Sequence, residues 1–195
     1  MKHLVITIGC EYGAKGNAIG KKIAQDLGIK FYDRDLVDEI IKEVGIPTDI
    51  MDRVEEGGTI AGKGAQGDVR GSFSKYADLT DRAIHVQKQI IRKLAQKEAC
   101  VIIGRSADYI LKDRDDVLNV FIHGDTPEKI QRITRLYNVE EQKAVKMMAD
   151  TDKRRMANYN FYTDQKWGKA SNYTLCLNSS KLGYDRCEKI IMECI

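Results

Sequence analysis

The sequence lacks the features of disulfide-rich, zinc-binding and membrane-spanning proteins. It has five cysteines, an odd number, and no two of them have the C-x-x-C spacing, which argues against a disulfide framework and against a structural zinc site. Reduced thiols lead us to expect a cytoplasmic protein. No run of about 18 apolar residues is present, so we expect no membrane partner. The apolar stretch at the N-terminus is too short for a signal peptide.

The sequence also lacks a large excess of positive or negative charge. Lysine and arginine total 32 and aspartate and glutamate total 29, which gives a net charge of +3. This excess is too small to indicate a nucleic-acid partner, and no RNA- or DNA-binding module is visible. The 195 residues, 43% of them hydrophobic and 31% charged, suit one globular domain. The oligomeric state is not indicated.

Apolar runs and helical patterns alternate along the chain. Short β-branched runs predict strands at 4–8, 29–32, 100–104, 117–122 and 175–177. Helical periodicity predicts helices at 18–27, 35–44, 79–97, 126–137, 139–162 and 183–194. Residues 46–78 break the pattern, and six of the sixteen glycines fall between Gly57 and Gly71, which is typical of a loop. The alternation predicts an α/β fold with a parallel sheet and helices on both faces.

A glycine-rich segment between the first strand and the first helix has the chemistry of a phosphate-binding loop. It reads Gly9-Cys-Glu-Tyr-Gly-Ala-Lys-Gly-Asn17. Glycines let backbone N–H groups turn toward a phosphate, and the helix N-terminus adds the positive end of its dipole. Lys15 could reach the terminal phosphates of a nucleotide. The alternative is a plain strand-to-helix turn.

The chain resembles the cytidylate kinase-like family over nearly its whole length. The resemblance lies in ITIGCEYGAKGNAIGKKIAQDLGIKFYDRDLVDEI, CVIIGRSADYIL, TPEKIQRITRLYNV, TDKRRMANYNFYTDQKWG and SNYTLCLNSSKLG, which occur in the expected order. It implies a single P-loop NTPase-like domain over 1–195, with a small helical or loop insertion at about 46–78 and an Arg-rich lid at about 138–168. The implied activity is transfer of the ATP γ-phosphoryl group to a nucleoside monophosphate with Mg²⁺. The acceptor that the resemblance favours most is CMP- or dCMP-like.

The resemblance also implies which residues bind the donor nucleotide. The segment lies on the pattern G-x-x-G-x-G-K-G-[ST], so Lys15 takes the lysine position and Ala14 a glycine position. Arg132 corresponds to an arginine near the donor nucleotide, although a solvated helix face is an equal alternative. The residues expected to bind ATP are Gly9, Gly13, Ala14, Lys15, Gly16, Asn17, Ala18 and Arg132.

Other positions correspond to the acceptor and the lid. Arg105 follows the third strand, where a guanidinium would hold the acceptor phosphate. Asp33 ends the second strand and could orient water or metal, or cap the next helix. Arg154 and Arg155 resemble lid arginines that act in catalysis with Lys15, and a surface charge run is the competing interpretation.

Two positions depart from the family pattern. Asn17 replaces the Ser or Thr that binds Mg²⁺, so its side-chain carbonyl is the candidate metal ligand. Glu39 stands where cytidylate kinases carry an acceptor-binding arginine. These departures leave two alternatives open: an ATP-binding kinase with another small-molecule acceptor, or a nucleotide-binding regulator without catalysis.

Overall fold

A five-stranded parallel sheet forms the centre of the protein. The computed structural model describes residues 4–43, 45 and 70–195. The strands are β1 (Val5–Cys10), β2 (Lys30–Tyr32), β3 (Cys100–Ile103), β4 (Val117–His123) and β5 (Leu175–Asn178). Their order in the sheet is β2-β3-β1-β4-β5, and every neighbouring pair is parallel. The expected parallel α/β fold is confirmed.

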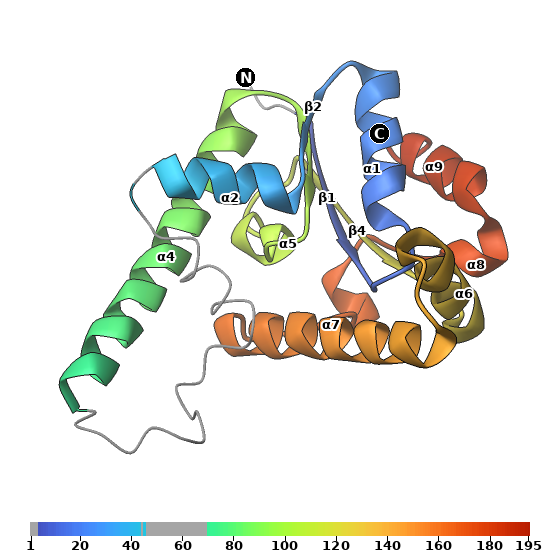
Figure 1. The fold of residues 1–195 in the computed structure, drawn as a ribbon. Helices are drawn as coiled ribbons and strands as arrows, with labels where there is room; N and C mark the ends of the chain where they lie inside the picture. Colours follow the sequence, from blue (N-terminus) through green and yellow to red (C-terminus); the bar gives the residue numbers. More distant parts are fainter. Residues whose placement is uncertain (1–3, 44, 46–69) are drawn as a thin grey trace.

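Helices pack on both faces of this sheet (Figure 1). They are α1 (Gly16–Leu27), α2 (Arg34–Glu43), α4 (Arg70–Lys97), α5 (Ala107–Ile110), α6 (Thr126–Tyr137), α7 (Glu141–Tyr162), α8 (Ser179–Leu182) and α9 (Tyr184–Met192), with a short 3₁₀ turn at Ala170–Asn172. Helices α1 and α9 cover one face, and α2, α4 and α5 cover the other. Helix α7 runs across the edge where the strands end, at the bottom of the view.

Alternation along each strand divides the core into two layers. Val5 and Cys100 face the layer under α2 and α4, whereas their neighbours Ile6 and Val101 face the layer under α1 and α9. All four side chains are fully buried. Buried β-branched runs of this kind are expected for parallel strands that are covered on both faces.

Several boundaries differ from the sequence prediction. Helix α4 begins at Arg70 rather than near Leu79. A glycine and two serines lower the helix propensity of this first part, but an established helix extends without a second cost of nucleation. Helix α8 was not expected, and the side chain of Asn178 caps it by accepting hydrogen bonds from two of its N–H groups. The first part of the predicted insertion, residues 46–69, lies outside the described residues. No helix of the described part is long and apolar enough to cross a membrane.

Gly20 allows α1 to pack closely on the sheet. A Cβ atom at this position would lie 2.7 Å from Cδ1 of Ile103 and 3.0 Å from Cδ1 of Ile8. Both isoleucines are buried, so their side chains have little room to move. This contact fixes the N-terminal half of α1, and with it the loop that precedes the helix.

We predict that Gly20→Val lowers the free energy of unfolding by about 1–3 kcal/mol, because the larger side chain overpacks this contact. The matched control is Ala18→Val on the exposed side of the same helix, where only the propensity cost of about 0.5 kcal/mol applies. Urea titration of both variants measures the difference. Equal losses at the two positions would contradict the close packing at Gly20.

Candidate active site

The loop between β1 and α1 is held in a conformation that favours glycine. Gly13 and Lys15 both have left-handed backbones, with φ of 86° and 72°. The N–H of Ala14 donates to the carbonyl of Glu11 at 3.1 Å and closes the turn. A Cβ atom on Gly16 would lie 2.5 Å from Cβ of Cys10, so only glycine lets the end of β1 approach the start of α1 this closely.

Lys15 and Arg132, both predicted to bind the donor nucleotide, meet at one tyrosine. Nζ of Lys15 lies 2.9 Å from the centre of the Tyr184 ring on α9. Nη1 of Arg132 on α6 donates to the Tyr184 hydroxyl at 2.5 Å. A cation over an aromatic ring is a stabilising arrangement. Lys15 is therefore bound to the protein on the side of the loop that faces α6 and α9.

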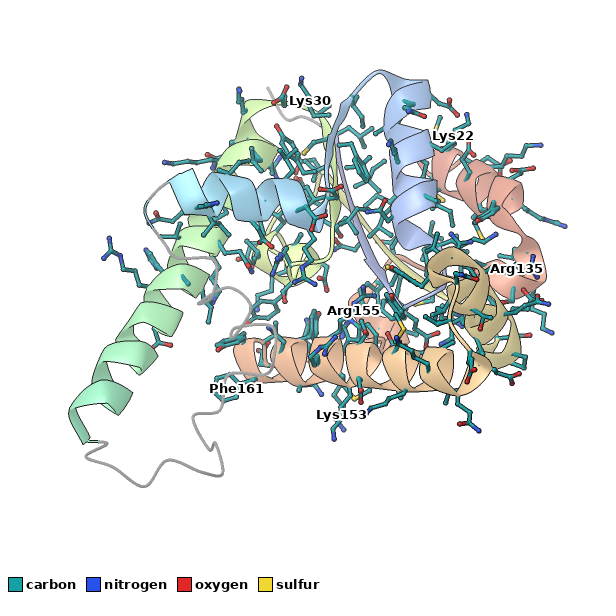
Figure 2. All side chains as sticks on the ribbon, in the orientation of Figure 1. Lys22, Lys30, Arg135, Lys153, Arg155 and Phe161 are labelled. Carbon is teal, nitrogen blue, oxygen red and sulfur yellow. The ribbon has the colours of Figure 1, made fainter. Side chains whose placement is uncertain are left out.

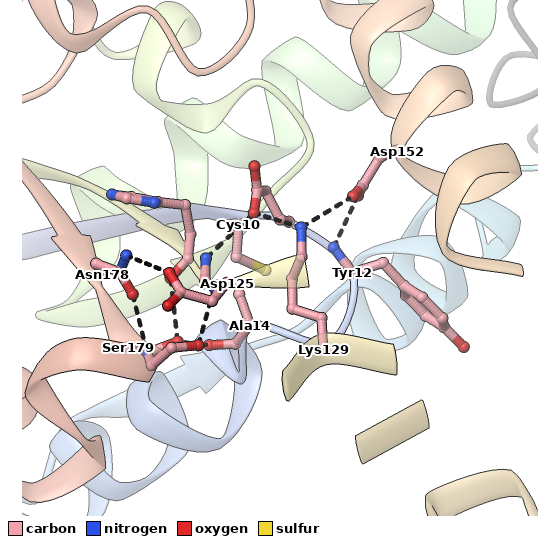
Figure 3. Close-up of polar contacts among 12 residues, drawn as sticks. Cys10, Tyr12, Ala14, Asp125, Lys129, Asp152, Asn178 and Ser179 are labelled. Atoms are coloured by element: carbon pink, nitrogen blue, oxygen red, sulfur yellow. Dashed lines mark hydrogen bonds and ion pairs between the residues drawn. The ribbon is translucent and has the colours of Figure 1, made fainter. Parts of the chain in front are cut away.

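A partly buried ion-pair network, centred on Lys129, joins the loop to α6 and α7 (Figure 3). Nζ of Lys129 lies 2.6 Å from the carboxylate of Glu11 and 3.9 Å from that of Asp152. Asp152 also accepts a hydrogen bond of 2.7 Å from the N–H of Tyr12, and Glu11 accepts one from the N–H of Gly124. Only 7% of the Lys129 side chain is exposed.

Burial raises the pKa of Asp152, and the Tyr12 N–H, Lys129 and Arg155 oppose that shift. The carboxylate nevertheless shows that a backbone N–H of the loop can bind an anionic oxygen. None of these contacts was predicted, because nothing in the sequence links Glu11 with Lys129 or Asp152.

Arg155 brings α7 onto the end of β1. Its Nη1 donates to the carbonyl oxygen of Cys10 at 2.7 Å. Figure 2 shows Arg155 directed toward the sheet and Lys153 directed away from it. Burial raises the pKa of the Cys10 thiol, while Arg155 acts in the opposite direction. Of the adjacent basic residues on α7, Arg155 therefore contacts the loop.

Arg154, the other predicted lid arginine, is exposed and lies 3.3 Å from the Thr151 hydroxyl. It lines a pocket of about 150 Å³ that it shares with Arg155. The closing movement expected of a lid is not tested by this arrangement and stays a prediction.

Four arginines from three parts of the chain line this pocket, which lies over the ends of β1 and β3. They are Arg34 of α2, Arg105 after β3, and Arg154 and Arg155 of α7. Only 6% of the Arg105 side chain is exposed, and it forms an ion pair with Asp38. Arg34 lies 3.8 Å from the same carboxylate. Guanidinium groups gathered at the ligand-binding edge of a parallel sheet are suited to a phosphate or carboxylate.

The pocket also contains polar groups that the sequence did not single out. Asp108 of α5 is 8% exposed and accepts a hydrogen bond of 2.6 Å from the Tyr159 hydroxyl. Burial raises the pKa of Asp108, and the bond from Tyr159 opposes that shift. Gln87 of α4 is also buried and lines the pocket. A single polar residue within a helix has no sequence pattern that would mark it as part of a pocket.

The remaining predicted residues lie at the margins. Asp33 accepts a hydrogen bond of 3.0 Å from the N–H of Leu36, so it caps α2, which is one of the two roles expected. Asn17 and Ala18 are exposed in the first turn of α1. The side chain of Glu39 lies outside the described residues.

Protein side chains alone offer little to a metal ion. Among residues 4–43, 45 and 70–195, no group of three or more His, Cys, Asp or Glu side chains could hold one. Mg²⁺ commonly keeps several waters and binds through substrate phosphates plus one or two protein oxygens. The single carbonyl of Asn17 fits an ion that arrives with a nucleotide, and does not fit a metal cage made by the protein.

Comparison with solved structures supports the same architecture. An uncharacterized protein from Eubacterium ventriosum is 29% identical, with a TM-score of 0.77 over 99% of this chain and 98% of that one. Shikimate kinase from Bacteroides thetaiotaomicron is 14% identical, with a TM-score of 0.55 over 98% and 97% of the two chains. A gluconokinase from Sinorhizobium meliloti is also 14% identical, with a TM-score of 0.53 over 98% and 90%. The two kinases show similarity of fold.

Sequence comparison gave one family. A search of the curated proteins found no match. The profile of the cytidylate kinase-like family matches residues 5–181. This range includes all five strands, the loop after β1 and every arginine of the pocket.

We predict that Lys129→Met lowers the free energy of unfolding by about 3 kcal/mol, because it leaves the Glu11 carboxylate without its buried partner. Adding Glu11→Gln should recover part of this loss. The control is Lys181→Met, which removes an ion pair of similar length, 2.7 Å, from a lysine side chain that is 72% exposed, and should cost less than about 1 kcal/mol. Denaturant titration of the three variants would contradict the network if both lysine substitutions cost the same.

Proposed function

The chain belongs to the cytidylate kinase-like family, and from this premise we propose that it is a phosphotransferase that moves the γ-phosphoryl group of ATP to a small phosphorylated acceptor. The most favoured acceptor is a nucleoside monophosphate of the CMP or dCMP type. The donor binds at residues 9–18 and Arg132. The acceptor binds in the pocket lined by Arg34, Arg105 and Arg154, with Asp33 at its margin.

One observation carries this proposal: the arginine pocket opens beside the loop, and Arg155 belongs to both. Arg155 lines the pocket and also bonds the carbonyl of Cys10. Phosphoryl transfer requires little covalent chemistry from a protein, and depends on alignment and on positive charge around the transferred group. A guanidinium group between the two proposed substrate sites would supply positive charge and would help to align the two substrates.

In the proposed reaction the loop and Lys15 bind the donor, and Arg105 binds the acceptor. The loop amides and the N-terminus of α1 bind the β- and γ-phosphates, and Lys15 leaves Tyr184 to neutralise them. Arg105 exchanges the carboxylate of Asp38 for the acceptor phosphate and so aligns it. An acceptor oxygen then forms a bond to the γ-phosphorus while the bond to the bridging oxygen of ADP breaks.

Arg154 and Arg155 stabilise the charge on the transferred group, and α7 limits the access of water to it. Mg²⁺ would supply neutralisation of phosphate charge when it is bound with the nucleotide, and the Asn17 side-chain carbonyl is the protein ligand that we propose for it.

Two alternatives remain in view. The fold is similar to that of a shikimate kinase and a gluconokinase. The same ATP site is therefore compatible with a different small-molecule acceptor. A nucleotide-binding regulator is favoured by the position of Lys15, whose ammonium group is bound at Tyr184. A regulator would bind ATP without transferring phosphate.

Coupled ADP release separates these alternatives. ATP and Mg²⁺ are supplied with CMP, dCMP, UMP, AMP or GMP in turn, and one acceptor should stimulate turnover. Arg155→Ala should lower kcat by about 100-fold or more, since it removes a charge-stabilising donor from the transfer site. Lys153→Ala, two positions away on the exposed side of α7, should retain wild-type kcat.

The opposite results are equally informative. ATP binding without acceptor-stimulated turnover across the panel would overturn the monophosphate kinase and favour the regulator or another acceptor. Equal losses in Arg155→Ala and Lys153→Ala would show that Arg155 has no special part in transfer.

A further inference from the structure

Gln87 carries a buried hydrogen-bonding group that the fold does not satisfy. Its side chain lies on α4 and the residue is 8% exposed. Its Nε2 donates to the main-chain carbonyl of Arg105 at 3.3 Å, which fixes the orientation of the amide. Its Oε1 has no hydrogen-bond partner among the described residues. A buried carbonyl without a partner destabilises a protein, so its presence calls for a role.

The position of Gln87 indicates that role. It lines the same pocket as Arg105 and Arg155, and its Nε2 bonds the main chain of Arg105, two residues after β3 ends. Asp108, also buried and in the same pocket, is the one acidic side chain among the described lining residues. The pocket thus presents guanidinium groups for an anion and, in Gln87 Oε1, a buried acceptor that the described residues leave without a partner.

An unsatisfied acceptor beside guanidinium groups matches a ligand that carries both an anionic group and an N–H donor. An amino group on an aromatic ring carries two N–H donors, whereas a ring carbonyl carries none and would face Gln87 Oε1 with a lone pair. Sites built to hydrogen-bond a particular substrate group discriminate strongly against analogues that lack it, because the buried protein group is then left unpaired.

We propose that Gln87 is a specificity-determining residue whose Oε1 accepts a hydrogen bond from an amino group of the phosphate acceptor. The proposal rests on the proposed function, because it takes the arginine pocket to be the acceptor site. It adds the part of the acceptor that is recognised away from its phosphate.

Binding of two matched probes without ATP tests the proposal. They are CMP and the analogue that lacks only the amino group, pyrimidin-2-one riboside 5′-monophosphate. Calorimetry should show that the wild-type protein binds CMP about 10-fold more tightly, the effect of one satisfied buried group. Gln87→Met, which is close in shape and apolar, should bind both probes equally. Gln89→Met, on the exposed side of the same helix, should keep the preference.

Thermal unfolding separates this role from a structural one. Gln87→Met removes the unsatisfied carbonyl together with the 3.3 Å hydrogen bond to the Arg105 carbonyl, and because these two effects oppose each other its Tm should stay close to that of the wild type. Equal binding of the two probes by the wild type, an unchanged preference in Gln87→Met, or binding of neither probe would overturn the proposal. A lower Tm with the preference retained would assign Gln87 to stability. Probe binding that persists without any ADP release would instead contradict the transferase and leave the recognition of the amino group intact.

Discussion

The docking of α7 on the end of β1 is the interaction on which the site depends. The peptide groups around residues 10–12 provide both contacts: the carbonyl of Cys10 accepts from Arg155, and the N–H of Tyr12 donates to Asp152. Lys129 forms ion pairs with both Glu11 and Asp152, and so links the loop to α7 a second time. Because the arginines of α7 reach the pocket only when this helix is docked, the loop and the pocket form one unit.

The groups suited to bind phosphate already have internal partners. Lys15 lies on the ring of Tyr184, Arg105 is paired with Asp38, and the N–H of Tyr12 is bonded to Asp152. Burying an unpaired charge would be costly, so these pairs hold the cations in place near the loop. A phosphate ligand at this site would have to displace a carboxylate or a ring face, and such an exchange would favour ligands of high negative charge.

Local patterns in the sequence predicted the sheet and the loop, since β-branched runs and glycines act over a few residues. They could not predict contacts between distant segments: Glu11 and Lys129 are 118 positions apart, and Tyr12 and Asp152 are 140 apart. The resemblance to a family correctly indicated the fold and brought attention to Arg105 and Arg155. It gave no hint of Gln87, because a single polar residue on a helix has no periodic signature, and its role follows only from what surrounds it.

A crystal structure with Mg²⁺ and a non-hydrolysable ATP analogue tests most directly whether the loop and α7 form one phosphate-transfer site. The account predicts the β- and γ-phosphates on the amides of residues 13–17, the γ-phosphate within reach of Arg155, and Lys15 moved from Tyr184 onto the phosphates. A nucleotide bound away from the loop, or phosphates on the loop with Lys15 still on Tyr184 and Arg155 out of reach, would contradict it.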